Sequence, residues 1–425
     1  MIQVLRTLAI SRRNGAPKGI ASICSSHPIV IRAAAREAAR AGQPLLLEAT
    51  CNQVNQFGGY TGMQPADFVR MAIDIARDEG LPAEAVILGG DHLGPNPWRK
   101  ESAPAAMLKA EQMVAAYARA GFRKIHLDAS MGCAGEPAIL GDAVIADRAA
   151  RLAKEAERAA AASGGAPPLY VIGTEVPPAG GAHHAIAGIE PTSLAAVQET
   201  IEVHREVFRR HGLSDAFSRV IAIVVQPGVE FGNENVVVYN RTKARHLASL
   251  LADEPGLVYE AHSTDYQGRV ALRELVEDGF AILKVGPELT FALREALYGL
   301  DLIASDLLPD YGARPLYAAM EEAMLDNPSH WKSHYSGPPG AQRLERHYSF
   351  SDRIRYYWGE PRAAAAVKRL TANLTGKIAP VTLFRQHLPA FEEFAGKPLN
   401  PVEVVICAIR RSLENYRFAA CGETV

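Results

Sequence analysis

Cysteine is scarce in this sequence of 425 residues, and the few cysteines present are widely spaced. None of them forms a C-x-x-C pair. Their number is odd, and they lie at Cys24, Cys51, Cys133, Cys407 and Cys421. Such a set is typical of reduced thiols rather than of a disulfide framework, so we expect a cytoplasmic protein.

Long apolar runs and an excess of charge of one sign are also missing. No stretch of about 18 consecutive apolar residues occurs, so we expect no membrane span. The first residues lack the basic segment and the apolar run of a signal peptide. Lysine and arginine number 45 against 47 aspartates and glutamates, a formal net charge of -2. This balance argues against a nucleic-acid-binding protein.

Three catalytic motifs are absent as well. There is no G-x-x-x-x-G-K-[ST] phosphate loop, so an ATP-using kinase has no support in the sequence. No G-x-G-x-x-G follows a predicted strand, which argues against a dinucleotide cofactor. No G-x-S-x-G nucleophile elbow occurs either. We therefore expect no nucleotide cofactor.

The sequence does contain a regular alternation of short apolar segments and longer, often alanine-rich segments. The short segments are predicted to be strands: Ile20–Cys24, Leu45–Ala49, Ala85–Leu88, Lys124–Asp128, Leu169–Thr174, Val220–Val225, Gly256–Ala261 and Ala281–Val285. The longer segments are predicted to be helices: Ile29–Ala41, Pro65–Asp78, Pro104–Ala120, Asp142–Ala162, Pro191–His211, Thr242–Ala252, Arg269–Asp278 and Glu288–Ser305. Apolar strands separated by helices are typical of a parallel sheet that is buried on both faces.

Eight such strand–helix units in roughly 300 residues match the (β/α)8 TIM barrel. A doubly wound sheet is the alternative, because the number of units does not prove that the sheet closes. After about Leu307 the sequence becomes richer in aromatic residues and in helix-like segments such as Ala363–Leu374 and Pro401–Tyr416. We predict an α/β fold with a barrel over residues 1–306 and a helical, aromatic-rich cap over residues 307–425.

Polar residues follow nearly every predicted strand. In a barrel, the carboxyl ends of the strands hold the active site. Alternate residues of a strand share a face, so His126 lies with Asp128, and Glu260 lies with His262. These two pairs can converge above the barrel axis. Imidazole and carboxylate groups together suit a divalent ion such as Zn2+ or Mn2+.

The polar residues at the strand ends also have structural interpretations. Asp91 and His92 can cap the loop that follows them, and His262 can form a buried hydrogen-bonded pair with Glu260. Lys284, near the end of the last strand, can anchor a substrate or support the fold, with Schiff-base chemistry as a further option.

Longer motifs carry a family resemblance. They are Cys51–Met63, Gly89–Trp98, His126–Gly132, Gly173–Gly181, Gln226–Gly232, Tyr259–Tyr266 and Ser349–Trp358. Together they resemble the Z-type subunit family of tagatose-1,6-bisphosphate aldolase over essentially the whole chain. That family is similar in layout to the class II aldolases, which are (β/α)8 barrels with a catalytic divalent metal ion.

The resemblance implies roles for particular residues. Asp91 corresponds to the catalytic base, and His92 and His262 correspond to metal ligands. Glu175 corresponds to the glutamate that follows the fifth strand. Class II aldolases use a ligand histidine after the sixth strand, where this chain has Gln226. We therefore expect Zn2+ or Mn2+ at a site formed by His92, Glu175, Gln226 and His262.

Substrate contacts are expected from several loops at the same end of the barrel. The glycine-rich phosphate loop of class II aldolases is replaced here by Ser-Thr-Asp-Tyr at 263–266. Phosphate binding by the loops after the last two strands is nevertheless expected for a barrel, with a contribution from the cap. The predicted substrate-binding residues are Glu48, Asn52, Ser263, Thr264, Gly286 and Arg353.

Two functions are known in the family that this chain resembles. Stand-alone members epimerise D-tagatose 6-phosphate to D-fructose 6-phosphate at C4. Other members are non-catalytic subunits that stabilise and activate a separate Y-type aldolase subunit. We predict the epimerase, with the accessory subunit as the alternative. The predicted partners are a ketohexose phosphate, a Y-type subunit under the alternative, and a second copy of the chain as a further hypothesis.

The position of C4 limits the chemistry of such an epimerase. In a 2-ketohexose C4 is β to the carbonyl carbon, so enolisation cannot invert it. Without a dinucleotide motif, cleavage and re-formation of the C3–C4 bond is the more economical mechanism. A divalent ion stabilises the enediolate that this cleavage produces. Proton transfer at the C4 hydroxyl needs acid–base groups, for which we predict Asp91, Asp128 and Glu260.

Overall fold

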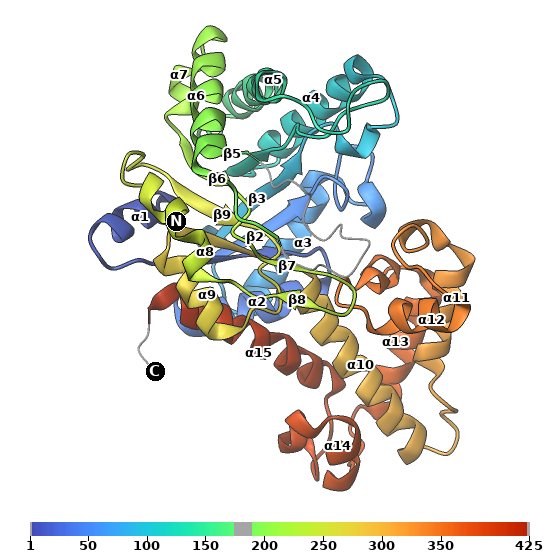
Figure 1. Ribbon diagram of the computed structural model, residues 1–425. Helices are drawn as coiled ribbons and strands as arrows, with labels where there is room; N and C mark the ends of the chain where they lie inside the picture. The colour runs from blue at the N-terminus through green and yellow to red at the C-terminus, as the bar shows by residue number, and fades with distance from the viewer. Residues whose placement is uncertain (1, 174–188, 423–425) are drawn as a thin grey trace.

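The computed structural model describes residues 2–173 and 189–422, and its centre is a closed barrel of parallel strands (Figure 1). Around the barrel the strands follow the order β1-β10-β9-β6-β5-β4-β3-β2. Their bounds are β1 Ile20–Cys24, β2 Leu45–Thr50, β3 Val86–Leu93, β4 Lys124–Leu127, β5 Leu169–Gly173, β6 Val220–Val224, β9 Val258–Ala261 and β10 Phe280–Val285. Because β1 pairs with both β2 and β10, the sheet is closed. The predicted (β/α)8 barrel is confirmed, and the doubly wound alternative is excluded.

Helices surround the barrel and connect its strands. They are α2 Pro28–Ala41, α3 Pro65–Asp78, α4 Ala103–Arg119, α5 Asp142–Ala162, α6 Leu194–Arg210, α7 Ser214–Phe217, α8 Arg241–Leu250, α9 Gly268–Glu277 and α10 Pro287–Leu307. Short 3-10 turns lie at η1 Gly59–Thr61, η2 Ala83–Ala85 and η3 Asn96–Trp98. Proline lies in the first turn of α2, α3, α4 and α10, where its missing N–H has no intrahelical partner to lose.

The elements that were not expected from the sequence include a helix and a hairpin. Helix α1, Gln3–Arg13, closes the amino-terminal end of the barrel, where Leu5 and Leu8 pack with interior residues such as Leu46 and Ile282. The second is an antiparallel hairpin of β7 Glu230–Phe231 and β8 Val236–Val237.

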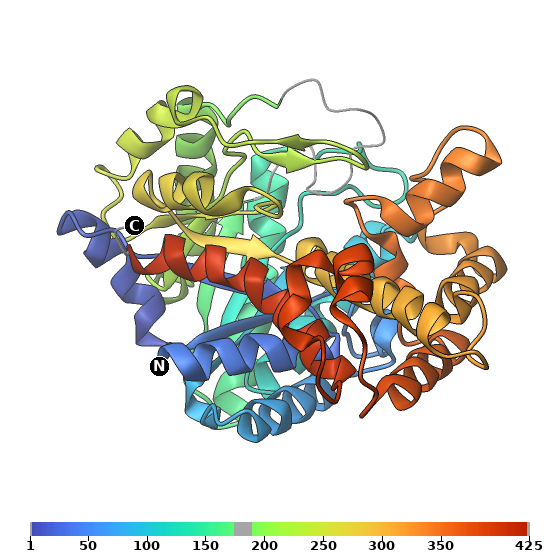
Figure 2. The same cartoon turned by 90° about the horizontal axis from the view of Figure 1, so that it is seen from below.

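A helical extension follows α10 and lies beside the barrel (Figure 1). Its elements are α11 Pro315–Asp326, η4 Pro328–His330, α12 Pro339–Tyr348, η5 Arg353–Tyr357, α13 Pro361–Leu374, α14 Val381–His387, η6 Pro389–Phe394 and α15 Pro401–Cys421. The last helix, α15, returns to the barrel and packs against α2, α9, α10 and β1 (Figure 2). The helical C-terminal region is as predicted, whereas the division at residue 306 stays a prediction, because α15 shares the core of the barrel.

A search of the described helices for a membrane span finds none of sufficient length and hydropathy.

Candidate active site

Three imidazole rings meet at the carboxyl ends of the barrel strands. His92 is the penultimate residue of β3, His126 lies in β4 and His262 follows β9. Their ring centroids are 4.8 to 5.3 Å apart. Asp91 joins them, and one ligand atom from each of the four residues lies within 4.8 Å of the others. This cluster is compatible with a bound divalent metal ion, because imidazole and carboxylate are preferred ligands of such ions.

Each imidazole also contacts a hydrogen-bond acceptor through one ring nitrogen. His92 Nδ1 lies 2.8 Å from Asp128 Oδ2, and His262 Nε2 lies 3.1 Å from Glu260 Oε1. His126 Nε2 donates to the carbonyl oxygen of Gly173 at 3.0 Å. Metal-bound histidines almost always donate their second N–H to such an acceptor, which fixes the tautomer and the ring orientation. His92 and His262 therefore have the hydrogen bonding expected of metal ligands, whereas Nδ1 of His126 also accepts the backbone N–H of His92 at 3.3 Å and lies 3.1 Å from Asp91 Oδ1.

Backbone strain marks the same strand ends. His92 has a φ of 49° and Ser263 a φ of 52°, in the left-handed region that residues with a Cβ rarely adopt. Such conformations cost about 1–3 kcal/mol each and concentrate at functional sites. The ring of the strained residue His92 lies 4.9 Å from that of His126 and 4.8 Å from that of His262.

A layer of buried charge lies directly beneath the imidazoles. Lys124 Nζ is 2.6 Å from Glu48 Oε1 and 2.7 Å from Glu260 Oε2, and all three side chains are fully buried. Lys284 Nζ contacts Glu48 as well and lies 2.7 Å from Asp91 Oδ1. Because each ammonium group lies between carboxylates, the buried charges compensate one another.

Gly89 in β3 makes room for this layer. A Cβ atom at this position would lie 2.6 to 2.8 Å from the carboxylate end of Glu48, closer than van der Waals contact allows. The side chain of Glu48 can reach Lys124 and Lys284 only because residue 89 has no side chain.

The two ammonium groups are held in the charged form. Burial by itself lowers the pKa of Lys284, but the negative charges of Asp91, Glu48 and Glu260 more than reverse this and raise the pKa well above its usual value. Lys124 has a raised pKa for the same reason. A charged amine is no nucleophile, so Schiff-base chemistry at Lys284 has no support.

The carboxylates of the cluster are held ionised. Burial raises the pKa of Asp91, but the charges of His92 and Lys284 outweigh it and bring the pKa well below its usual value. For Asp128 the hydrogen bond from His92 likewise overcomes burial and lowers the pKa. Both groups are therefore ionised at neutral pH and can bind a cation.

A cavity of about 570 Å3 opens above the cluster, a size that is ordinary for a small-molecule site. Of the predicted site residues, those that line it are Asn52, Asp91, His92, Asp128, His262, Ser263, Gly286 and Arg353. The loop after β2 contributes Tyr60 to the wall, and the extension contributes Arg355 and Tyr356. The barrel and the extension thus enclose one cavity.

The other predicted site residues lie elsewhere. Glu48 and Glu260 belong to the charged layer below the cavity. Thr264 is buried and donates its hydroxyl to the carbonyl oxygen of Lys284 at 2.6 Å. Glu175 lies outside the described residues.

Gln226 lines a neighbouring cavity rather than the one above the imidazoles. Its Oε1 accepts hydrogen bonds from the backbone N–H groups of Gly228, at 2.8 Å, and Val229, at 2.9 Å. The amide oxygen, which is the atom that binds metal ions, thus already stabilises the loop after β6.

Several residues of the site were missed from the sequence. The strand face that His126 shares with Asp128 did indicate a possible metal site, but His126 was not included among the expected ligands. Lys124 lies two positions before His126 and therefore on the same face of the strand. This spacing could have predicted a charged side chain inside the barrel. Tyr60 and Arg355 carry no such signal, because loop and extension contacts do not follow a strand period.

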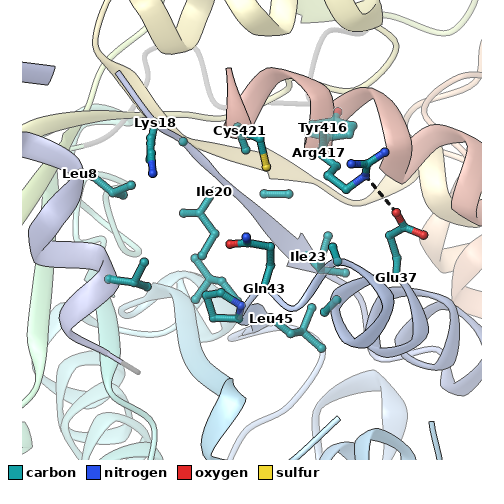
Figure 3. A pocket seen from close by; sticks show the side chains of 18 of the residues that line it. Leu8, Lys18, Ile20, Ile23, Glu37, Gln43, Leu45, Tyr416, Arg417 and Cys421 are labelled. Carbon is teal, nitrogen blue, oxygen red and sulfur yellow. Dashed lines mark ion pairs between the residues drawn. The ribbon is translucent and has the colours of Figure 1, made fainter. Parts of the chain in front are cut away.

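A larger cavity, of about 660 Å3, lies near the amino-terminal ends of β1 and β2, between α1, α2 and α15 (Figure 3). Its lining is mainly apolar and includes Leu8, Ile20 and Leu45. The Arg417 guanidinium in its wall contacts the carboxylate of Glu37 at 3.2 Å. This cavity is far from the cluster of imidazoles and offers no comparable set of catalytic groups.

Comparison with known proteins decides the family. A family model described as "D-tagatose-1,6-bisphosphate aldolase subunit GatZ/KbaZ-like" matches residues 5–421. The chain belongs to this GatZ/KbaZ-like family. The resemblance carried by the sequence motifs is thereby confirmed.

Two relatives of this GatZ/KbaZ-like protein are closely similar to it. A curated protein of Agrobacterium fabrum (strain C58 / ATCC 33970), named D-tagatose 6-phosphate 4-epimerase, is 57% identical over 423 residues, which are 100% of this chain and 99% of the relative. The crystal structure of a probable tagatose 6 phosphate kinase from Sinorhizobium meliloti 1021 is 52% identical. It superposes with a TM-score of 0.86 and covers 95% of this chain and 100% of its own.

Proposed function

We propose that this protein is a metal-dependent epimerase that interconverts D-tagatose 6-phosphate and D-fructose 6-phosphate. The cluster of His92, His126 and His262, with an acceptor behind each ring, carries the proposal. The substrate is taken from the 57% identical relative, which is named for this reaction.

The proposed metal ligands are drawn from His92, His126 and His262, and the proposed ion is Zn2+ or Mn2+. Gln226 is left out, because its amide oxygen already accepts two backbone hydrogen bonds. Glu175 keeps its proposed ligand role from the family resemblance. A bound divalent ion supplies Lewis-acid stabilisation of the negative charge that develops on the oxygens of C2 and C3.

The proposed reaction cleaves and re-forms the C3–C4 bond. Loss of the C4 hydroxyl proton turns C4 into an aldehyde carbon, and the electron pair of the C3–C4 bond moves to the three-carbon fragment as an enediolate. The aldehyde fragment keeps the phosphate. After the aldehyde presents its other face, the enediolate adds back to C4 and the alkoxide is reprotonated. No oxidant or nucleotide is consumed.

Asp128 and Asp91 are the proposed proton-transfer groups. Both line the cavity and are ionised at neutral pH. Asp128 Oδ1 accepts a hydrogen bond from the hydroxyl of Ser130 at 2.7 Å, and its Oδ2 contacts His92. These contacts hold the carboxylate in one orientation. Glu260 does not reach the cavity, so we assign it to positioning His262 rather than to proton transfer.

The description of the family as an aldolase subunit favours a second candidate function. In this alternative the chain is a non-catalytic subunit that stabilises a separate Y-type aldolase subunit. The two candidates differ in whether the chain turns over substrate by itself.

The deciding experiment incubates the purified protein alone with D-tagatose 6-phosphate and Zn2+ or Mn2+. We expect fructose 6-phosphate to form, a chelator to stop the reaction and added metal to restore it. No turnover alone, together with enhanced activity of an added Y-type aldolase subunit, would instead establish the accessory function.

Metal content tests the ligand assignment separately from activity. We expect His126→Ala to lower the bound metal at least about tenfold, because a lost ligand or its support costs affinity of this order. The matched control is His387→Ala, since His387 pairs with Asp306 at the surface of the extension. Elemental analysis of the two dialysed variants makes the comparison. Equal metal content would contradict the assignment.

A further inference from the structure

Two arginines of the extension face the cavity without a carboxylate partner in the described part of the chain. Arg353 donates to the carbonyl oxygen of His330 at 2.9 Å, and its buried Nε has no partner among the described residues. Arg355 donates to the backbone carbonyls of Ser351 and Asp352 and to the hydroxyl of Tyr356. Neither guanidinium group therefore forms an ion pair with a carboxylate of the described residues.

Two other arginines of the extension are paired with carboxylates. Arg346 contacts Glu321, and Arg362 contacts Glu322 at 3.1 Å. Arg314, Arg343 and Arg369 also have no carboxylate partner among the described residues, but none of them lines the cavity. A guanidinium group in a cavity wall can take its compensating negative charge from a ligand, and an unpaired charge loses solvation when a ligand covers it. The position of Arg353 and Arg355 in the cavity wall therefore favours an anion as their partner.

Both arginines are held in a fixed position. Asp352, which precedes them, is fully buried in an ion pair with Arg294 at 3.1 Å and accepts a hydrogen bond from the hydroxyl of Thr290 at 2.7 Å. Arg294 and Thr290 belong to α10, the helix after the last barrel strand. The ring of Tyr356 lies 4.5 Å from the guanidinium of Arg355. The arginines are thus positioned relative to the barrel before a ligand binds.

The usual phosphate position of a barrel is already filled in this chain. Phosphate groups often bind at the loops after the last two strands, where a helix amino terminus offers free N–H groups. Here Asp265 Oδ1 accepts from the N–H groups of Gly286, at 3.0 Å, and Glu288, at 2.8 Å. Pro287, between them, has no N–H. The carboxylates of Asp265 and Glu288 also repel an anion from this end of α10.

We propose that the phosphate group of the substrate binds to Arg353 and Arg355, rather than at the amino terminus of α10, and that this pair selects phosphorylated over unphosphorylated ketohexoses. The inference rests on the proposed function, since it concerns the substrate of that reaction. Arginine suits the task because its planar group donates two parallel hydrogen bonds to phosphate oxygens.

This location gives the arginine pair a defined part in the reaction. After the C3–C4 bond breaks, the phosphate remains on the aldehyde fragment, while the enediolate fragment carries none. The arginines hold the phosphate while the aldehyde turns to present its other face. The two fragments are thereby retained at different parts of one cavity until the bond re-forms.

Binding of inorganic phosphate to the full-length protein, measured by calorimetry, tests the site without relying on activity. We expect Arg353→Gln and Arg355→Gln each to raise the Kd for phosphate about 10- to 100-fold, the usual effect of losing a hydrogen bond between charged groups. The matched control is Arg362→Gln, whose partners are surface carboxylates. Phosphate affinity within about twofold of wild type in both test variants, or an equal loss in the control, would overturn the proposal.

Steady-state kinetics supply the second measurement. The same variants should raise the KM for D-tagatose 6-phosphate about tenfold or more, while kcat/KM for unphosphorylated D-tagatose stays within about twofold of wild type. If a glutamine variant fails to fold, Arg355→Lys replaces it, because lysine keeps the charge but not the paired donors. Reduced phosphate affinity in that variant supports the site, and wild-type affinity refutes it.

The two proposals fail in different ways. A protein without epimerase activity whose phosphate binding still depends on Arg353 and Arg355 would refute the proposed function but retain the anion site. An active epimerase whose Kd for phosphate and KM for D-tagatose 6-phosphate are unchanged by substitution of either arginine would refute only the inference.

Discussion

Asp265 is a buried carboxyl group that titrates near neutral pH. Burial, reinforced by the negative charge of Glu288, raises the pKa of Asp265 to about 7. The folded protein therefore holds this proton more tightly than the unfolded chain, in which an aspartate titrates near pH 4. The stability gained from protonation is complete below about pH 4 and is lost as the pH rises through 7.

We expect Asp265→Asn to remove this pH dependence. The asparagine amide oxygen can still accept from the N–H groups of Gly286 and Glu288, but the side chain carries no charge at any pH. Urea unfolding at about pH 5 and about pH 8 should show a fall in stability for the wild type that is smaller in the variant. Asp326→Asn, at an exposed carboxylate of α11, is the control. Identical pH profiles for wild type and Asp265→Asn would show that Asp265 does not titrate in this range.

Individual site residues could be predicted where they lie at the end of a strand and carry an imidazole or a carboxylate group. Asp91, His92 and His262 satisfy both conditions, and the structure brings them together. Gln226 also follows a strand, but its side chain turns into its own loop, which no strand period specifies. Arg355 lies far from the strand ends in the chain, so only the folded extension brings it to the cavity.

At the level of elements, the turn η5 depends on one buried ion pair. Arg294 is 2% exposed and Asp352 is fully buried, so removing one partner leaves the other charge without compensation. Arg294→Met should lower the free energy of unfolding by about 3–5 kcal/mol. Because η5 carries the arginine pair, the variant should also weaken phosphate binding.

Urea unfolding of Arg294→Met beside Arg385→Met measures this effect. Arg385 pairs with Glu392 at the surface, with 68% of its side chain exposed, so its loss should cost less than about 1 kcal/mol. Equal stability of the two variants would mean that the buried pair does not hold η5.

The barrel elements could be predicted well, and the exceptions have physical reasons. Predicted strands such as Ile20–Cys24 match the structure because apolar runs end sharply at polar residues and glycines. The hairpin β7–β8 has strands of two residues each. Such strands are too short for an alternation of apolar and polar residues to be recognised in the sequence. The sequence did contain evidence for helix α1, because its buried residues Leu5, Leu8 and Ala9 recur at the spacing of an α-helix.

For the whole molecule, the extension and the barrel are joined by α15. This helix buries Val405, Ile409 and Tyr416, and the hydroxyl of Tyr416 donates to the carbonyl oxygen of Thr264 at 2.8 Å. A barrel without α15 exposes the apolar surface of α2, α9 and β1. The division at residue 306 stays a prediction, and these contacts of α15 lead us to expect that the chain cannot be divided there into two independently folding parts.

We expect a chain ended after residue 306 to show no cooperative thermal unfolding. Loss of α15 and of the core of the extension removes much of the hydrophobic stabilisation of the barrel. This loss far exceeds the net stability of a typical domain, which is about 5–15 kcal/mol. Circular dichroism melting of this chain beside the full-length protein makes the comparison. A sharp transition in the short chain would show that the barrel folds by itself.

The hydrogen bond from the N–H of Gly19 to the carbonyl oxygen of Ala420, at 3.0 Å, joins the two ends of the sequence, and it has a consequence for biosynthesis. The first barrel strand begins next to Gly19, and α15, the helix that covers it, is synthesised roughly 400 residues later. At about 5–20 residues per second, that interval lasts about 20 to 80 s. During this time β1 and α2 lack the cover of α15, so we expect the nascent chain to expose an apolar surface that chaperones can bind.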